Sequence, residues 1–254
     1  MGQTIALANQ KGGVGKTTTA VNLGAALAER GRRVLVVDAD PQSNATKGFG
    51  IDPYTSRKTT YDVLLNPEAG AGIAIMATAF GVDLLPSTID MAAAEYELVG
   101  QVARESRLRE ALAAVSERYD YILIDPPPSL GLFTMNALAA ADDVLVPLQV
   151  ETYALTGLTQ LQRTLKLMSK VNNKLSAESF HVLCTMVRKN VNLSREVEGA
   201  AREAFGERVY RTTIPENVRL AEAPAVGKPI THYDPTCSGA LAYQALAEEI
   251  DNGK

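Results

Sequence analysis

Residues 11–18 read Lys11-Gly12-Gly13-Val14-Gly15-Lys16-Thr17-Thr18, and they lie between an apolar run at 5–8 and a stretch of helical periodicity at 16–30. Glycines let the backbone approach an anion closely, and the N–H groups and dipole at a helix start favour negative charge. Lys16 supplies a positive charge for the outer phosphates of a nucleotide, and the Thr17 hydroxyl stands where magnesium is ligated. The whole segment therefore predicts a phosphate-binding loop that takes ATP and Mg²⁺.

This loop departs from the common pattern Gly-x-x-x-x-Gly-Lys-Thr, because Gln10 stands where the first glycine would fall. It carries an additional lysine, Lys11, at its start. That arrangement is the deviant form of the phosphate loop.

Apolar runs of strand length alternate with longer helical stretches along the rest of the chain, which is typical of parallel strands joined by crossover helices. We expect strands at 5–8, 34–38, 82–85, 121–125, 144–148, 180–186 and 209–212. We expect helices at 16–30, 91–99, 107–117, 132–140, 155–171, 193–204 and 238–250, with a surface excursion at 66–81. The first helix places Ala20, Leu23, Ala26 and Leu27 on one face and stops at Gly31.

These elements predict an α/β fold, namely a single P-loop NTPase domain over residues 1–254. Its sheet is mostly parallel and twisted, with about seven strands and helices on both faces.

Composition narrows the class of protein. With 254 residues, 46% of them hydrophobic, the chain can bury a sizeable core. The net charge of −4 argues against a uniformly basic surface but leaves room for a local basic patch. No apolar run approaches the ~20 residues of a membrane-spanning helix, and Cys184 and Cys237 lack partners at metal-ligand spacing. We expect a cytoplasmic protein that does not associate with a membrane.

Three aspartates follow or end strand candidates. Asp38 and Asp40 come at and just past the end of the second strand, and Asp125 ends the run 121–125. The carboxyl ends of strands line the ligand crevice of an open α/β sheet, so the three carboxylates can converge on the metal and the attacking water. We assign Asp125 to the magnesium side, through water, and Asp40 to orienting the attacking water. Asp38 could support either role.

At this point the chain resembles the ParA/Soj family of chromosome- and plasmid-partitioning ATPases, within the wider ParA/MinD group. The resemblance runs along nearly the whole chain. It rests on residues 11–18, Asp38-Ala39-Asp40-Pro41-Gln42, Asp125-Pro126-Pro127-Pro128-Ser129 and Ile214-Pro215-Glu216-Asn217-Val218-Arg219-Leu220-Ala221-Glu222-Ala223-Pro224. The last two segments favour the partitioning branch.

The resemblance implies a homodimer that sandwiches two ATP molecules, with Lys11 of each subunit reaching the phosphates bound by the other. Slow hydrolysis of ATP then loosens the dimer. In the family, the segment matching Pro215 and Asn217 contacts adenine, and the arginine matching Arg219 contacts DNA. Family members often carry an arginine at the position of Asn190, where this chain has Arg188 and Lys189 just before it. We add these two residues to the expected DNA surface.

The resemblance also implies partners. The ATP-bound dimer binds nucleoid DNA without sequence preference, through phosphate contacts. A centromere-binding protein of the ParB type stimulates hydrolysis. Because the chain begins only a few residues before its first strand, we expect no N-terminal DNA-binding domain.

Other classes fit less well. A MinD-like or cargo-positioning regulator is the nearest alternative, but a MinD-like tail would be a basic amphipathic helix and residues 241–250 are acidic. An electron carrier of the nitrogenase-reductase type would need cysteines in other segments. A metabolic ligase with the same loop would leave Lys11 and the segment 217–224 unexplained. A GTP switch would need an Asn-Lys-x-Asp or Thr-Lys-x-Asp motif, which the sequence lacks.

Overall fold

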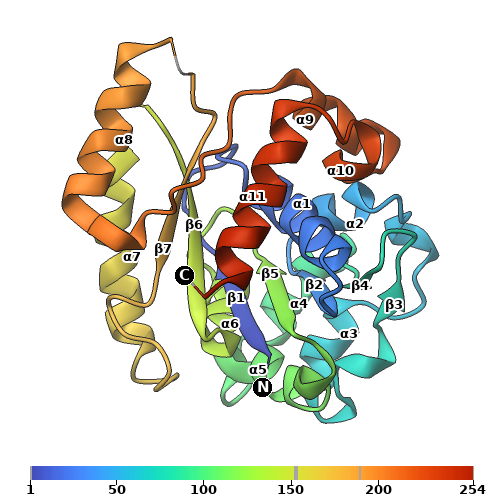
Figure 1. The fold of residues 1–254 in the computed structure, drawn as a ribbon. Coiled ribbons are helices and arrows are strands. Elements are labelled where there is room, and N and C mark those ends of the chain that lie inside the picture. The colour runs from blue at the N-terminus through green and yellow to red at the C-terminus, as the bar shows by residue number, and fades with distance from the viewer. Residues whose placement is uncertain (1, 152–153, 189, 254) are drawn as a thin grey trace.

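A computed structural model describes residues 2–151, 154–188 and 190–253, and within them the chain builds one seven-stranded sheet (Figure 1). The strands are β1 (Gln3–Leu7), β2 (Val34–Asp38), β3 (Met76–Ala77), β4 (Val82–Leu85), β5 (Tyr121–Asp125), β6 (Asp143–Gln149) and β7 (His181–Thr185). Their order across the sheet is β3-β4-β2-β5-β1-β6-β7. All neighbouring pairs are parallel except β3 and β4. The predicted mostly parallel α/β sheet is confirmed.

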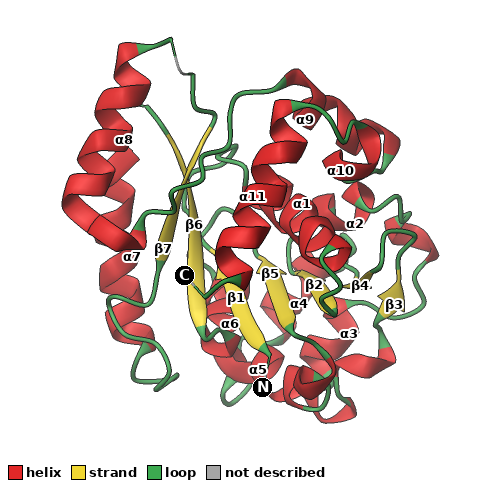
Figure 2. Ribbon diagram, in the orientation of Figure 1, coloured by secondary structure: helices red, strands yellow, loops and turns green. Residues whose placement is uncertain are grey.

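Helices cover both faces of the sheet, as Figure 2 shows. They are α1 (Lys16–Glu29), α2 (Asn44–Gly48), α3 (Thr60–Leu65), α4 (Met91–Glu97), α5 (Arg107–Ala113), α6 (Leu132–Ala140), α7 (Ala154–Met168), α8 (Asn192–Phe205), α9 (Val218–Glu222), α10 (Ile230–Tyr233) and α11 (Ser238–Asp251). One apolar layer packs α1, α2, α10 and α11 against the sheet, and the other packs α3 to α8. Several helices are shorter than expected: α4 ends at Glu97 and α5 at Ala113.

Helix α1 fixes the phosphate loop to the sheet. Its predicted apolar face is fully buried, and it packs against α11 on one side and against β2 on the other. A Cβ added at Gly24 would lie 2.9 Å from a methyl of Val36, so glycine allows this close approach. Gly31, with φ of +81°, ends the helix as expected.

The seventh strand is not the one that the sequence indicated. Residues 209–212 make a single bridge, from Val209 to Val182, and do not extend the sheet. The reason is that the Glu249 carboxylate accepts the N–H groups of Arg211 and Thr212 at 2.7 and 2.9 Å, so these donors do not reach a strand. The seventh strand is instead β3, a two-residue antiparallel edge inside the expected surface excursion.

The topology gathers the carboxyl ends of β1, β2 and β5 side by side. Asp38 at the end of β2 and Asp125 at the end of β5 are register partners in the sheet. The loop after β1 therefore opens beside both carboxylates.

Candidate nucleotide site

The phosphate loop, residues 11–18, has the backbone conformation of an anion cradle. Gly13 and Gly15 have φ of +76° and +92°, a region that other residues rarely adopt. No side chain caps the start of α1, and its first turn holds no acidic residue, so its N–H groups face the loop unmatched by a carboxylate. The Thr185 hydroxyl at the end of β7 donates to the Val14 carbonyl at 2.9 Å and anchors the loop. A Cβ at Gly12 or Gly13 would meet nothing within 4 Å, so the cradle is open on that side.

Lys16 lies inside this cradle. Its side chain is buried, and its ammonium donates to the Lys11 carbonyl at 3.3 Å. Burial lowers the pKa of Lys16, while the nearby charges of Asp125 and Asp40 oppose that shift. A buried cation with two carboxylates close by suits a ligand that brings both negative charge and a metal.

Asp125 is the least satisfied polar group of the site. It is fully buried, and neither carboxylate oxygen has a hydrogen bond of normal geometry among the residues that the structure describes. Burial above all, and then the charge of Asp38, raise the pKa of Asp125 to about 8, whereas the Thr17 hydroxyl and Lys16 oppose the rise. The Thr17 hydroxyl is thus near enough to influence the carboxyl, although it does not make a full hydrogen bond with it.

These residues fit a magnesium ion that is held mainly by phosphate and water. No group of three or more His, Cys, Asp or Glu side chains in the described part of the chain forms a metal cage. Mg²⁺ bound with a nucleotide keeps several waters and takes one or two protein ligands. Thr17 and the unsatisfied Asp125, acting through water, are the expected ones, and the ion would supply charge stabilisation at the phosphates.

The other two aspartates are placed differently. Both carboxylate oxygens of Asp38 already have partners: Oδ2 accepts from the Thr46 N–H and hydroxyl at 2.8 and 2.7 Å, and Oδ1 from the Asp40 N–H at 3.2 Å. Burial raises the pKa of Asp38 to about 6. Asp40 is nearly buried and accepts the Gln42 N–H at 2.9 Å. This geometry favours a supporting role for Asp38, whereas the charge of Asp40 acts on Lys16 and opposes the lowering of the Lys16 pKa.

A cavity of about 250 Å³ opens beside the loop and fits the expected position of the base. It is lined by Gly15, Thr18, Met186, Pro215, Asn217 and Tyr243, among others. The Asn217 amide is held at both ends, because its oxygen accepts the Arg219 N–H and its nitrogen donates to the Ser238 hydroxyl, both at 2.8 Å. The sequence pointed to Pro215 and Asn217 but not to Met186 or Tyr243, whose only sequence signal is their apolar character.

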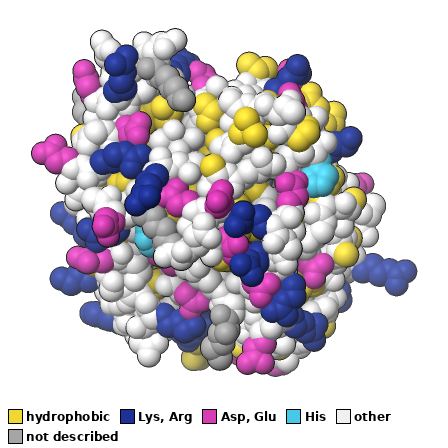
Figure 3. Space-filling model, viewed as in Figure 1, with side chains coloured by type: hydrophobic (Ala, Val, Ile, Leu, Met, Phe, Trp, Pro, Cys, Tyr) yellow, Lys and Arg dark blue, Asp and Glu magenta, His cyan; other side chains and the backbone are white. Residues whose placement is uncertain are grey.

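The predicted basic residues lie at the surface in ion pairs. Arg188 pairs with Glu216, and Arg219 pairs with Glu222 at 2.8 Å and with Asp234 at 3.5 Å. Lys189 lies outside the described residues. On the face seen in Figure 3, basic and acidic side chains are interleaved, consistent with the net charge of −4.

The Lys11 side chain, at the start of the phosphate loop, has its polar partners at the end of β6. Its ammonium pairs with Glu151 and lies 3.3 Å from the Gln149 amide oxygen, at the end of β6. About half of the side chain, 49%, is exposed. No pattern in the sequence pointed to these partners.

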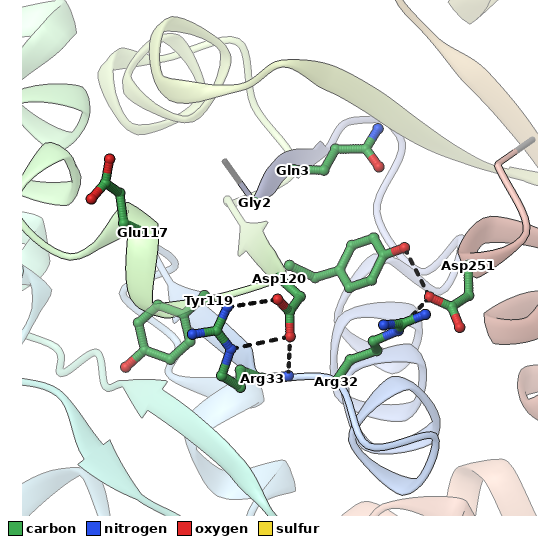
Figure 4. A pocket seen from close by; sticks show the side chains of 9 residues that line it. Gly2, Gln3, Arg32, Arg33, Glu117, Tyr119, Asp120 and Asp251 are labelled. Carbon is green, nitrogen blue, oxygen red and sulfur yellow. Dashed lines mark hydrogen bonds and ion pairs between the residues drawn. The ribbon is translucent and has the colours of Figure 1, made fainter.

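A second hollow, of about 490 Å³, lies at the opposite end of the sheet (Figure 4). Four of its charged residues form two ion pairs: Arg33 with Asp120 at 2.7 Å, and Arg32 with Asp251 at 2.6 Å. Both of its arginines thus have carboxylate partners within the chain, whereas Asp125 beside the phosphate loop has none.

The fold and this loop define the molecule as a P-loop ATPase that uses ATP and Mg²⁺. A family model described as "AAA domain" matches residues 2–177. The chain is 51% identical to the sporulation initiation inhibitor protein Soj of Bacillus subtilis over 98% of both chains. It is 48% identical to the chromosome partitioning protein ParA of Caulobacter vibrioides, over 98% of this chain and 93% of that one. The chain belongs to the ParA/Soj family of partitioning ATPases.

A solved structure shows the same fold with ligands. The cobyrinic acid a,c-diamide synthase of Mycobacterium smegmatis, with a bound ATP analogue and magnesium, aligns with a TM-score of 0.83 and 37% identity. The alignment covers 98% of this chain and 93% of that chain. The expected fold, family and cofactors are thus confirmed, whereas the roles of individual site residues stay predictions.

Proposed function

We propose that this ATPase drives DNA segregation by switching between a DNA-bound dimer and a free state. ATP binding builds a dimer with two sandwiched nucleotides, the dimer binds nucleoid DNA without sequence preference, and slow hydrolysis releases it. A ParB-type centromere-binding protein speeds that hydrolysis. The proposal assigns DNA contact to the ATPase domain itself, through Arg219, Arg188 and Lys189. The relatives named as chromosome partitioning proteins support it, because the chain matches them along almost its full length.

The placement of Lys11 is the observation that carries the proposal. In the single chain, its side chain is turned outward to Glu151 rather than inward to the loop, and it is half exposed. An exposed ion pair of this kind contributes only about 0–1 kcal/mol, so phosphates of a second subunit could readily replace Glu151. A lysine delivered across the interface would add charge to the phosphoryl-transfer site, as an arginine finger does.

A membrane-directed role of the MinD type has less support. Helix α11 buries its apolar face in the core, including Tyr243, Leu246 and Ile250, so that face does not meet a lipid surface. Among the described residues, no helix is both long and apolar enough to cross a bilayer. A cargo-positioning regulator that acts through another surface remains the second candidate, and the DNA experiment separates the two.

The test is binding of a non-specific DNA duplex without nucleotide, with ADP, with ATP and with a slowly hydrolysed ATP analogue, at two salt concentrations. We expect binding only with ATP or the analogue, weakened by salt because phosphate contacts release counterions. Arg219→Glu should abolish retention while sparing the dimer. The matched control is Arg118→Glu, an exposed arginine just before β5 at the other end of the sheet. DNA binding in every nucleotide state, or in none, would contradict the switch.

A further inference from the structure

Three buried hydroxyl groups donate hydrogen bonds to Asp38 or Asp40, at the end of β2 and in the loop that follows it. They are Thr46 in α2, Thr60 at the start of α3 and Ser87 just after β4, and all three are fully buried. We call them the hydroxyl relay. No sequence motif singles them out, and none of the three lines the base cavity.

Ser87 is the hub of this relay because it uses two groups. Its hydroxyl donates to the Asp40 carbonyl at 2.8 Å, and its N–H donates to the Thr46 hydroxyl oxygen at 3.0 Å. The Thr46 hydroxyl in turn donates to Asp38 Oδ2 at 2.7 Å. Ser87 thus holds the Asp40 backbone directly, and it holds the Asp38 carboxylate through the Thr46 hydroxyl.

Thr60 fixes the same loop from the other side. Its hydroxyl lies 2.7 Å from the Asp38 carbonyl and 3.1 Å from the Pro86 carbonyl, and its N–H donates to the Pro86 carbonyl at 2.8 Å. The Asp38 carboxylate then accepts the Asp40 N–H. Both the N–H and the carbonyl of Asp40 are therefore held by buried partners, which fixes the backbone from which its carboxylate projects.

We propose that Ser87 is a positioning residue for ATP hydrolysis, which acts by holding the Asp40 carboxylate toward the phosphate loop. The proposal rests on the role given above to Asp40 as the residue that orients the attacking water. Buried hydrogen bonds in a low-dielectric interior rigidify the groups they join. A carboxylate that orients water must be held within a fraction of an ångström, and misplacement of about 1 Å can cost about 100-fold in rate. ATP binding depends on other residues and should not need the relay.

The experiment compares variants by single-turnover hydrolysis, by affinity for a slowly hydrolysed ATP analogue and by thermal stability. Ser87→Ala should lower the hydrolysis rate about 10- to 100-fold while analogue affinity stays within about twofold. Thr46→Val keeps the side-chain shape, loses the hydroxyl and should show the same split, whereas Thr46→Ser keeps the hydroxyl and should restore the rate. The matched control is Thr88→Val, which removes a nearly buried hydroxyl that faces Asp90 rather than the relay.

The outcomes separate this inference from the assignment of Asp40. If Asp40→Ala stops hydrolysis while Ser87→Ala and Thr46→Val both turn over at the wild-type rate, the relay has no positioning role and the inference is wrong. If Asp40→Ala itself hydrolyses ATP normally, the assignment of Asp40 fails and the inference fails with it. A purely structural relay would lower the thermal stability of Ser87→Ala and Thr46→Val but leave the rate per folded molecule unchanged, which would also overturn the inference.

Discussion

The two ends of β5 carry aspartates in opposite electrostatic states. Asp120, just before the strand, accepts three hydrogen bonds from Arg33, at 2.9, 3.2 and 2.7 Å, and this arginine lowers the pKa of Asp120 to about 2. Asp125, at the last position of the strand, is buried without such a partner, and its pKa is raised to about 8. Figure 4 shows the paired end.

This difference indicates a structural role for the aspartate at the amino end of β5 and a candidate functional role for the one at the carboxyl end. At the amino end, Arg33 pairs with Asp120 and Arg32 with Asp251, so these charges already have partners within the chain. At the carboxyl end, the chain tolerates a buried carboxyl that it does not satisfy, next to a buried lysine and an open loop. A buried carboxyl without hydrogen-bond partners destabilises the fold, so Asp125 is a functional-site candidate: a ligand that brings a metal ion can supply the missing partner.

The largest effect on ATP binding is expected when Lys16, at the carboxyl end of the sheet, is replaced. Lys16→Ala removes the buried cation that meets the phosphates, and a lost charge-assisted hydrogen bond of about 1.5–3 kcal/mol weakens binding about 10- to 100-fold. Loss of the charge itself adds to that, so no saturable ATP binding is expected in a fluorescent-nucleotide titration. The matched variant at the paired end, Arg33→Ala, should bind ATP as the wild type does. Unchanged ATP affinity in Lys16→Ala would show that the carboxyl end of the sheet does not bind ATP through Lys16.

The pH dependence of stability should have opposite signs at the two ends of β5. The pKa of Asp125 is higher in the folded than in the unfolded chain, so the folded protein holds a proton that the unfolded one releases, and stability falls as pH rises from about 4 to about 8. Asp125→Asn removes this loss. At pH 8 and above, the nucleotide-free variant should be more stable by about 2 kcal/mol, because the buried amide keeps part of the desolvation cost.

The control for that prediction is Asp120→Asn. The pKa of Asp120 is lowered, so its stabilising contribution is present above about pH 4 and is lost as pH falls through about 2. Its side chain is 35% exposed, which limits the contribution to about 1 kcal/mol. Denaturant unfolding at about pH 3, 5 and 8 measures both variants: the interval from pH 5 to 8 reports on Asp125 and the interval from pH 5 to 3 on Asp120. Equal slopes with pH in the wild type and in Asp125→Asn would show that Asp125 is not the strained group.

Local chemistry explains what the sequence could predict. The loop 11–18 and the aspartates 38, 40 and 125 were placed correctly at strand ends, because glycines, a lysine and strand-terminating carboxylates are readable in a short window. The apolar face of α1 was likewise readable from its period. These features depend on neighbours a few positions apart.

Contacts between distant residues explain what the sequence could not predict. Strand β3 has two residues and no pattern, and the run at 209–212 lost its strand hydrogen bonds to Glu249 on α11, 38 and 37 positions away. The hydroxyl relay joins residues 22, 41 and 47 positions apart. Such pairings give the aspartates different surroundings: both carboxylate oxygens of Asp38 are hydrogen-bonded, whereas those of Asp125 lack partners among the residues that the structure describes.

The smallest effect is expected at the exposed ion pair of Arg219 and Glu222. This pair tests whether an arginine that already has a carboxylate partner in the protein can still bind a DNA phosphate. Glu222 accepts from Arg219 at 2.8 Å and from the Tyr233 hydroxyl at 3.0 Å, and both partners of the ion pair are about half exposed. For Arg219 to meet a DNA phosphate, it must exchange this carboxylate. Glu222→Gln keeps the side-chain size, removes the competing charge and should raise DNA affinity of the ATP-bound protein about two- to fivefold, the factor for about 0.5–1 kcal/mol. Salt should diminish the gain, since the exchanged contacts are exposed.

Glu216→Gln, beside Arg188, tests the second arginine in the same titration of a fluorescent duplex. An affinity that stays unchanged in both variants would place the DNA contacts away from these arginines, whereas a gain in only one identifies the arginine that trades its protein partner for DNA.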